Sequence, residues 1–357
     1  MSDVVPTHIF DLTPEALTDS FKAMRLPAFR SKQVLQWIYE KQVDSWDTMT
    51  NLGKADRVKL SEHFTILRGQ TVRHQLATDG VQKLLVDWSG AKLPIVTNTS
   101  NQTECVMIPS ESRKTACISS QVGCPVGCKF CASGLDGVDQ NLTSGQIVEQ
   151  VWQLARMQGV GRISNVVFMG MGEPLANFNE VVKAVQFINA PWGMGISARK
   201  ITVSTVGLPA QIRRLADIDL PITLAISLHA PNDDLRRQLI PWADYVSIAQ
   251  LLEAGQYFFR KTGREITLEY ILLGRVNDQL EHAYELAKVA RSLRSNVNLI
   301  RYNEVTGLPY KRPDTKDVLA FEEVLRDKGV NVHIRASRGR DIAAACGQLR
   351  RENAGTC

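Results

Sequence analysis

The sequence has no long apolar run, and this absence removes a whole class of protein from consideration. No stretch approaches the roughly 20 consecutive apolar residues that a membrane-spanning helix needs. The first residues, Met1–Val4, also lack the basic and apolar regions of a secretory signal peptide. The chain shows no internal repeat and no low-complexity tract. We therefore expect a cytoplasmic protein without a membrane partner.

An excess of charge of one sign is also missing. The 42 Lys and Arg residues against 37 Asp and Glu residues leave a formal net charge of only +5. This balance is compatible with an RNA partner, but it suits many cytosolic enzymes equally well. The chain has 357 residues, of which 44% are hydrophobic, so it is long enough for one large domain with a small one appended.

The seven cysteines lack the arrangement of a disulfide framework. Their number is odd, and most of them lie in one stretch of a long chain. In a reducing compartment such a cluster indicates metal binding or catalysis.

Changes in the apolar pattern divide the chain into four expected parts. They are a small helical accessory domain, a β-rich segment that bridges two domains, a parallel βα barrel and a C-terminal segment, at residues 1–68, 69–109, 110–336 and 337–357. In the first part Thr13 suits an N-cap and Pro14 the first helical position. In the last part, a turn and a short helix are expected to contain Cys346.

The third part alternates strand-like and helix-like runs. The expected strands are 116–120, 166–170, 201–206, 222–228, 265–273 and 296–303, with a further strand at 330–335. Six βα units predict an α/β fold with an incomplete (βα)6 barrel, because a closed barrel of this kind needs eight. Ligands of parallel α/β sheets bind at the carboxyl ends of the strands, and the motifs below fall there.

Three cysteines stand on one short loop, but a fourth metal ligand is missing. Cys124, Cys128 and Cys131 have CxxxCxxC spacing, which brings three thiolates together. A structural zinc site takes four ligands, and an electron-transfer 4Fe-4S cluster takes four cysteines. A 4Fe-4S cluster on three cysteines leaves one iron open, which S-adenosylmethionine (SAM) can chelate through its amino and carboxylate groups. The alternative is a structural metal site completed by a distant ligand.

A CxxxCxxC loop followed by an alternating βα chain resembles the radical SAM superfamily. The resemblance implies that an electron from the cluster cleaves SAM to a 5′-deoxyadenosyl radical, so the cofactor carries the difficult chemistry. Gly172 and Glu173 lie just past a strand and resemble the family's Gly-Glu-Pro motif. The remaining residues that match SAM-contacting positions are Ser204, Ser227, Leu228, His229 and Asn303. Considered singly, Ser204 and Asn303 would suit turn or capping roles, and His229 would suit a structural role.

Two further cysteines stand in distinctive contexts: Cys117 in Ala-Cys-Ile-Ser-Ser-Gln-Val-Gly and Cys346 in Ala-Ala-Ala-Cys-Gly-Gln-Leu. With the motifs between them, these contexts resemble the RlmN/Cfr family of RNA adenine methyltransferases, from about Leu26 to Leu349. The resemblance implies that one SAM methylates Cys346 and that a second SAM yields the radical that abstracts hydrogen from the S-methyl group. The carbon radical then adds to adenine, and Cys117 releases the RNA by forming a disulfide with Cys346.

Glu104 matches the position of the family's proton acceptor. Without the resemblance it would be interpreted as a solvated carboxylate on a strand, and Cys346 as a small buried residue in a helix. Cys105 and Cys357 match no family role, and we expect a strand-core residue and a tail thiol, respectively.

The resemblance implies methylation of adenine C2 in 23S rRNA, and in some members in tRNA, with two SAM per turnover. It also implies a monomer that takes electrons from a donor such as flavodoxin or ferredoxin. A Cfr-like enzyme would form 8-methyladenine with the same catalytic residues, but the Gly-Met-Gly-Glu-Pro run and the chain length favour the RlmN-like interpretation.

Two more distant interpretations of the same residues are a radical SAM enzyme that acts on another substrate and a non-catalytic RNA-binding module that holds a cluster or zinc. The first leaves the paired cysteines unexplained. The second leaves Cys117, Cys346 and the residues that match SAM-contacting positions without a role.

Basic residues give a possible RNA surface on the helical domain and around the C-terminal segment. They are Arg25, Arg30, Lys32, Lys41, Arg199, Lys200, Arg335, Arg338, Arg340, Arg350 and Arg351. Such side chains contact successive phosphates of the RNA backbone, while the target base is extruded into the barrel. Each one alone is more often a solvated surface charge, and the group that flanks Cys346 is the part we expect to contact RNA.

Overall fold

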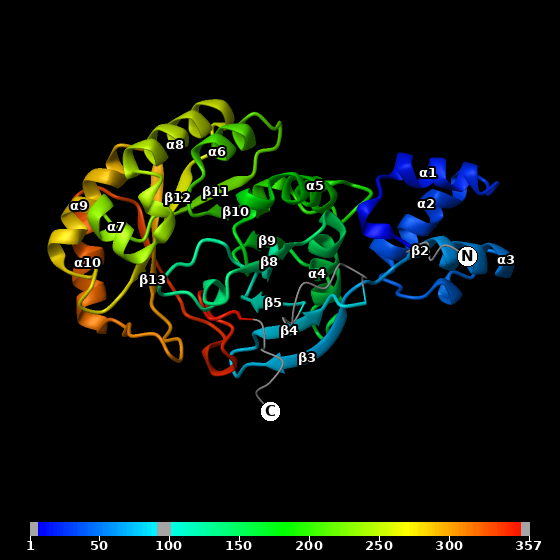
Figure 1. Cartoon of the computed structure of the whole chain (residues 1–357), viewed down its shortest axis with the longest axis horizontal. Helices are drawn as coiled ribbons and strands as arrows, with labels where there is room; N and C mark the ends of the chain where they lie inside the picture. Colours follow the sequence, from blue (N-terminus) through cyan, green and yellow to red (C-terminus); the bar gives the residue numbers. More distant parts are fainter. Residues whose placement is uncertain (1–5, 91–100, 351–357) are drawn as a thin grey trace.

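The computed structural model describes residues 6–90 and 101–350, and its N-terminal part is a small helical domain (Figure 1). Thr13 caps α1 (Pro14–Ala23) by accepting a hydrogen bond from the backbone of Ala16. The expected helix from Phe29 is present as α2 (Phe29–Leu35), which continues into a turn of π-helix, and α3 (Lys54–His63) follows. The short strands β1 (Thr7–His8) and β2 (Phe64–Thr65) pair in parallel and join the two ends of this domain.

A single large sheet forms the frame of the rest of the described chain. Its strand order is β14-β13-β12-β11-β10-β9-β6-β5-β4-β3. The strands from β6 to β14 in this sheet run parallel, and they are β6 (Lys114–Cys117), β9 (Asn165–Phe168), β10 (Ile201–Thr205), β11 (Thr223–Ser227), β12 (Ile266–Leu272), β13 (Ser295–Arg301) and β14 (Val332–Arg335). Each begins close to its expected start, and the α/β radical SAM architecture is confirmed.

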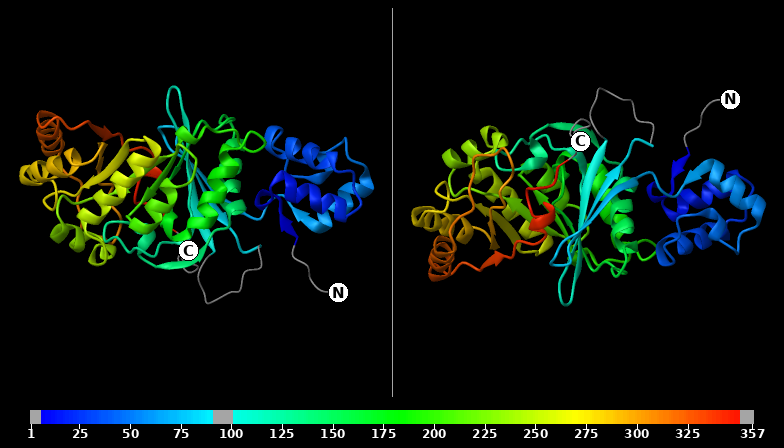
Figure 2. Two further views of the ribbon diagram at one scale, coloured as in Figure 1. Left: turned by 90° about the horizontal axis from the view of Figure 1, so that it is seen from above. Right: turned by 90° about the horizontal axis from the view of Figure 1, so that it is seen from below.

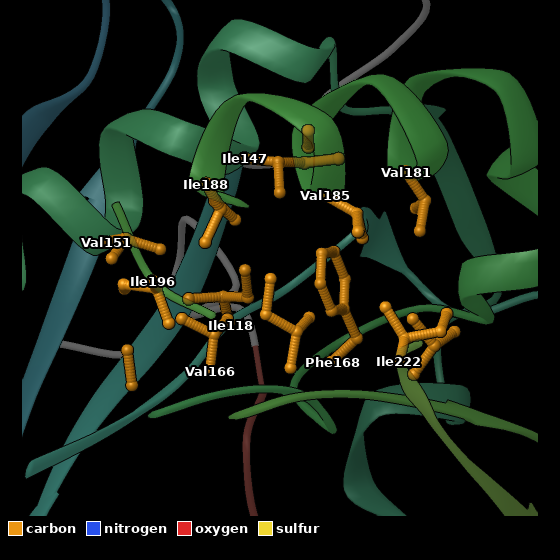
Figure 3. Packing of buried hydrophobic residues seen from close by; sticks show 14 of the residues in the cluster. Ile118, Ile147, Val151, Val166, Phe168, Val181, Val185, Ile188, Ile196 and Ile222 are labelled. Carbon is orange, nitrogen blue, oxygen red and sulfur yellow. The ribbon is translucent and has the colours of Figure 1, made fainter. Parts of the chain in front are cut away.

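Helices cover the outer face of the parallel strands, as Figures 1 and 2 show. They are α4 (Ser144–Arg156), α5 (Phe178–Asn189), α6 (Pro209–Ala216), α7 (Asp233–Leu239), α8 (Ile248–Thr262), α9 (Leu280–Arg291) and α10 (Thr315–Asp327). Capping boxes begin α4 at Thr143 and α8 at Ser247. Figure 3 shows how the apolar sides of α4 and α5 meet the sheet, where Val151 and Val185 face Val166 and Phe168. This packing fixes the strand ends that carry the site.

The β-rich segment is not a separate bridging sheet. β3 (Gln70–Leu76), β4 (Gln82–Asp87) and β5 (Gln102–Pro109) pair antiparallel with one another, and β5 pairs antiparallel with β6. Because β6 also pairs with β9, the segment extends the main sheet without a break. The short turn between β5 and β6 permits this direct pairing, which the alternation of residues within one strand could not reveal.

The C-terminal segment, residues 336–350, is an irregular strap that returns from β14 across the antiparallel strands (Figure 1, red). Its short 3₁₀ helix covers Arg340–Ile342 and ends before Cys346, which lies in a turn. The expected helix around Cys346 is therefore wrong. Left-handed backbone at Ala343 (φ 49°) and Gly347 (φ 82°) explains why no helix continues through the cysteine.

In the part of the chain that the structure describes, each helix is too short or too polar to cross a membrane.

Candidate active site

The three clustered cysteines line one pocket at the carboxyl ends of the parallel strands. Their loop lies between β7 (Gln121–Gly123) and β8 (Val138–Asn141), which pair antiparallel. The backbone of Cys124 donates to Gly137 at 2.8 Å, and the backbone of Ala132 donates to Gly347 of the strap at 2.8 Å. The loop is thus held between the small β7–β8 hairpin and the strap that carries Cys346.

The chemistry of this loop fits an iron–sulfur cluster. Burial raises the pKa of the Cys124 thiol to about 12 and that of Cys128 well above its usual value, so these thiols are neutral unless a metal binds them as thiolates. Among the described residues, no three His, Cys, Asp or Glu side chains converge closely enough to hold a single metal ion. Three cysteines on one loop suit a multi-iron cluster, because each thiolate binds a different iron.

Glu173 lies on the wall of the same pocket, directly after Gly172. Gly172 has φ 103°, and a side chain there would lie 2.7 Å from Ser120 Oγ, so the tight turn requires glycine. The Glu173 carboxylate accepts backbone hydrogen bonds from Leu175 at 2.9 Å and Val206 at 2.7 Å. Burial nevertheless raises the pKa of Glu173 to about 7. A bound amino group would therefore favour its charged form.

Ser204, Ser227 and His229 also form part of the pocket wall. The hydroxyls of Ser204 and Ser227 lie 3.4 Å apart. His229 Nδ1 accepts from the backbone of Ile271 at 3.1 Å, and burial lowers the pKa of His229 to about 3. The ring is therefore neutral, and its proton is on Nε2, which makes that nitrogen a hydrogen-bond donor.

Leu228 and Asn303 lie outside this wall. The Leu228 side chain is buried, and its backbone donates to the Glu269 carbonyl at 3.0 Å, so it shapes the turn between two pocket residues. Asn303 lines a neighbouring cavity together with Cys346 and accepts from Arg312 Nη1 at 3.1 Å. The structure thus brings most of the expected SAM-contacting residues together, but it places Asn303 on the other side of the strap cysteine.

Cys346 lines both the cluster pocket and the neighbouring cavity. Cys117 lies at the end of β6, where it is buried in a small apolar cluster with Ala344 and Leu349 of the strap. Cys117 on β6 and Cys346 on the strap are 229 positions apart in the sequence. The contact between β6 and the strap brings their two segments together. The six cysteines within the described ranges are all free.

Glu104 is buried on β5 and is not the solvated carboxylate that its sequence context alone would favour. Its Oε1 lies 2.7 Å from Lys83 Nζ, and its Oε2 accepts from the backbone of Arg350 at 2.9 Å. The neighbouring Cys105 is fully buried in the strand, as expected for a core residue. Cys357 lies outside the described residues.

Comparisons with known proteins agree with this geometry. Residues 7–66 match the ribosomal RNA large subunit methyltransferase N-terminal domain, and residues 118–287 match the radical SAM superfamily. A probable dual-specificity RNA methyltransferase RlmN from Rhodopirellula baltica is 42% identical over 96% of this chain and 91% of its own length. The chain belongs to the RlmN family. A dual-specificity RNA methyltransferase RlmN from Dichelobacter nodosus is 40% identical over 96% of this chain and 93% of its own.

A solved structure supports the same assignment of fold. The crystal structure of a radical SAM methyltransferase from Sphaerobacter thermophilus is 39% identical, with a TM-score of 0.92, and the match covers 97% of this chain and 100% of that one. This RlmN-family protein is therefore an RNA methyltransferase of the radical SAM type, and its family implies a 4Fe-4S cluster and SAM. The non-catalytic module is excluded, and the RlmN-like interpretation is favoured over the Cfr-like one.

Sequence reasoning missed three charged residues that shape the site of this RlmN-family protein. Arg236 is fully buried and donates to the carbonyls of Leu228, Val206 and Val246, which fixes the turns after β10 and β11. Glu269 is buried on β12 and lines the cluster pocket. Glu269 could have been noticed in the sequence, because it is a charged residue inside an otherwise apolar strand. Arg236 could not, because the sequence of its helix resembles that of an ordinary exposed helix.

The third residue is Arg335, which was expected as part of the RNA-contacting group that flanks Cys346 and not as a charge that acts on the catalytic thiols. It lines the cavity beside Cys346, and its Nη1 lies 3.6 Å from Met169 Sδ. Burial raises the pKa of Cys117 to about 12 and also raises that of Cys346, whereas the Arg335 guanidinium lowers both. A fixed positive charge near two thiols favours their reactive thiolate forms.

Proposed function

We propose that this RlmN-family enzyme methylates C2 of an adenine in 23S rRNA, and in tRNA, through a methyl group carried by Cys346. One observation carries this proposal: Cys346 lines the same pocket as the three clustered cysteines, while Cys117 packs against Ala344 and Leu349 of the strap. A carrier thiol and a resolving thiol thus belong to one site. The relatives named dual-specificity RNA methyltransferases support two RNA substrates.

The first step loads the carrier. The Cys346 thiol loses its proton, its sulfur forms a bond to the SAM methyl carbon, and the bond between that carbon and the sulfonium sulfur breaks. The nearby Arg335 guanidinium stabilises the thiolate. Glu173, the Ser204 and Ser227 hydroxyls and the His229 Nε2–H are placed to bind the polar groups of SAM.

The second step needs a radical because C2 of adenine is an electrophilic amidine carbon, which does not attack a methyl cation equivalent. A cluster held by Cys124, Cys128 and Cys131, with SAM bound and a donor such as flavodoxin or ferredoxin to reduce it, would supply a 5′-deoxyadenosyl radical. The Cys346 S-methyl group provides the hydrogen atom and becomes the carbon that bonds to the ring. Glu104 accepts the proton that leaves the ring carbon, and the unpaired electron that remains on the ring would return to the oxidised cluster.

The last step separates protein from RNA. The Cys117 thiolate attacks the Cys346 sulfur, the bond between that sulfur and the transferred carbon breaks, and the carbon takes a proton to become a methyl group. The resulting disulfide needs two electrons from an external reductant before the next turnover. Packing of Cys117 against the strap supports this role.

Replacing Cys346 with alanine is expected to prevent methyl loading and to reduce RNA methylation to background. The test is peptide mass spectrometry of the reconstituted protein after incubation with SAM alone, before any RNA is added. Wild-type protein should carry a methylated thioether at Cys346, and the variant should carry none. A methyl group on another cysteine would show that the carrier is assigned to the wrong residue.

A further inference from the structure

A buried ion pair links two strands beside the site. Lys83 on β4 and Glu104 on β5 are both almost fully buried, with exposed fractions of 5% and 6%. In the antiparallel register Leu85 lies opposite Glu104, so Lys83 is a diagonal neighbour on the same face of the sheet. The Lys83 ammonium and the Glu104 carboxylate are 2.7 Å apart. The ion pair is therefore buried and shielded from solvent.

Both members of the pair also hold the strap that carries Cys346. Lys83 Nζ donates to the Ala343 carbonyl at 3.2 Å, and Glu104 Oε2 accepts from the Arg350 backbone at 2.9 Å. These two strap residues bracket Cys346 on either side. The ion pair therefore fixes the strap around the carrier cysteine, and Ala343 has left-handed backbone at the contact.

The positive charge of Lys83 favours the ionised form of Glu104. A buried carboxylate without a nearby cation takes up a proton, because desolvation penalises the charged form. Among the described residues, Glu304 and Arg350 also line this cavity, and the Arg350 guanidinium lies 3.4 Å from Asp136. Cys105 and Cys117 lie nearby on β5 and β6, and their pKa values are raised, so they are neutral. Lys83 favours the ionised carboxylate that a proton acceptor must have.

We propose that Lys83 is a positioning residue of the methyl transfer: it keeps Glu104 ionised and ties it to the strap on both sides of Cys346. The inference rests on the proposed role of Glu104 as proton acceptor. Lys83 itself touches neither SAM nor the reacting carbon; it acts through Glu104 and the Ala343 carbonyl. In this way the carrier cysteine and the proton acceptor keep a fixed relative position during the reaction.

The test compares Lys83→Met and Lys83→Gln with wild-type enzyme in RNA methylation assays between pH 6 and 9. Removing the positive charge raises the pKa of Glu104, so the acid limb of the rate profile should move to higher pH by about one to three units. At pH 6, the lowest pH assayed, the rate should fall several-fold, and it should recover at alkaline pH. Lys83→Gln keeps a hydrogen-bond donor for the Ala343 carbonyl. It therefore tests the loss of the charge even if Lys83→Met fails to fold. Methyl loading of Cys346 by SAM alone does not need Glu104, so its pH dependence should match that of wild type.

Lys114→Met is the matched control. Lys114 also donates from a partly buried position to backbone carbonyls, those of Gly159 and Val160, but it lies at the start of β6, at the opposite end of this strand from Cys117. This variant should lose thermal stability without shifting the pH profile. Lys83→Arg keeps the cation, and its acid limb should stay near that of wild type.

A double-variant cycle separates a positioning role from a merely structural one. Glu104→Gln alone should reduce the rate by about 10²- to 10⁴-fold, and adding Lys83→Met should lower it no further. A wild-type pH profile in both Lys83 variants, or an additive loss that is equal at all pH values, would overturn the inference and leave the proposed function intact. Full activity of Glu104→Gln would instead remove the proton-acceptor role and the inference with it.

Discussion

Replacement of Cys117 with alanine is expected to leave the enzyme covalently joined to its RNA after a single reaction. Cys117 is buried against Ala344 and Leu349, the strap residues on either side of Cys346 in the sequence. Without it, the bond between the Cys346 sulfur and the transferred carbon has no nucleophile to break it. Loading of Cys346 and radical addition do not need Cys117, so the adduct should accumulate nearly stoichiometrically. A denaturing gel of protein incubated with labelled RNA, followed by mass spectrometry of the nuclease-resistant adduct, measures it.

Cys105→Ala is the matched control for this experiment. Cys105 is also a buried cysteine, fully enclosed on the adjacent strand β5, but it lines neither the cluster pocket nor the cavity beside Cys346. That variant should turn over and release its RNA without accumulating the adduct. Multiple turnovers by Cys117→Ala with no covalent species would contradict the role of Cys117 and would point to another resolving group.

The second large effect is expected from Cys124→Ala. Each of the three clustered cysteines lines the same pocket, and a cluster left with two protein thiolates is poorly held. The reconstituted variant should lose the brown cluster absorbance and fall to background both in SAM cleavage and in RNA methylation. Its methyl loading of Cys346 reports separately whether that step also depends on the bound cluster.

Iron and sulfide content, visible absorbance and 5′-deoxyadenosine formation together measure this effect. Cys105→Ala serves again as the control, because it removes a cysteine but no expected cluster ligand. If Cys124→Ala kept both its absorbance and its SAM cleavage, the cluster would have to be held by other residues. The radical mechanism on this loop would then be wrong.

Local patterns in the sequence were sufficient to predict the cluster loop and the parallel strands. The three clustered cysteines lie on a single loop, so their spacing can be recognised in a short stretch of sequence. The apolar runs of buried strands such as β12 and β13 can be recognised in the same way. The continuity of β3 to β5 with the main sheet was not predicted, because a strand's own pattern does not say which strand it pairs with. A turn was expected in the C-terminal segment, but the short helix was wrongly expected to contain Cys346, for a related reason. An alanine-rich run favours helix locally, and contacts of the strap with Thr78, Asp79 and Lys83 hold it in another conformation.

The candidate site shows the same division between local and long-range information. Glu173 and His229 line one pocket because each follows its own strand to the same end of the sheet. The pairing of Lys83 with Glu104 and the position of Arg335 beside Cys346 depend on side chains brought together by the tertiary fold. No spacing rule within one segment contains that information.

The central claim is that Cys346 carries the methyl group and that a radical step moves its carbon to adenine C2. The most direct test incubates the reconstituted wild-type enzyme anaerobically with methyl-deuterated SAM and large-subunit rRNA, and then measures the nucleosides and the 5′-deoxyadenosine by mass spectrometry. The account predicts 2-methyladenosine that has lost one methyl deuterium, with that deuterium in 5′-deoxyadenosine. A product that keeps every deuterium, or one methylated at C8, would contradict it.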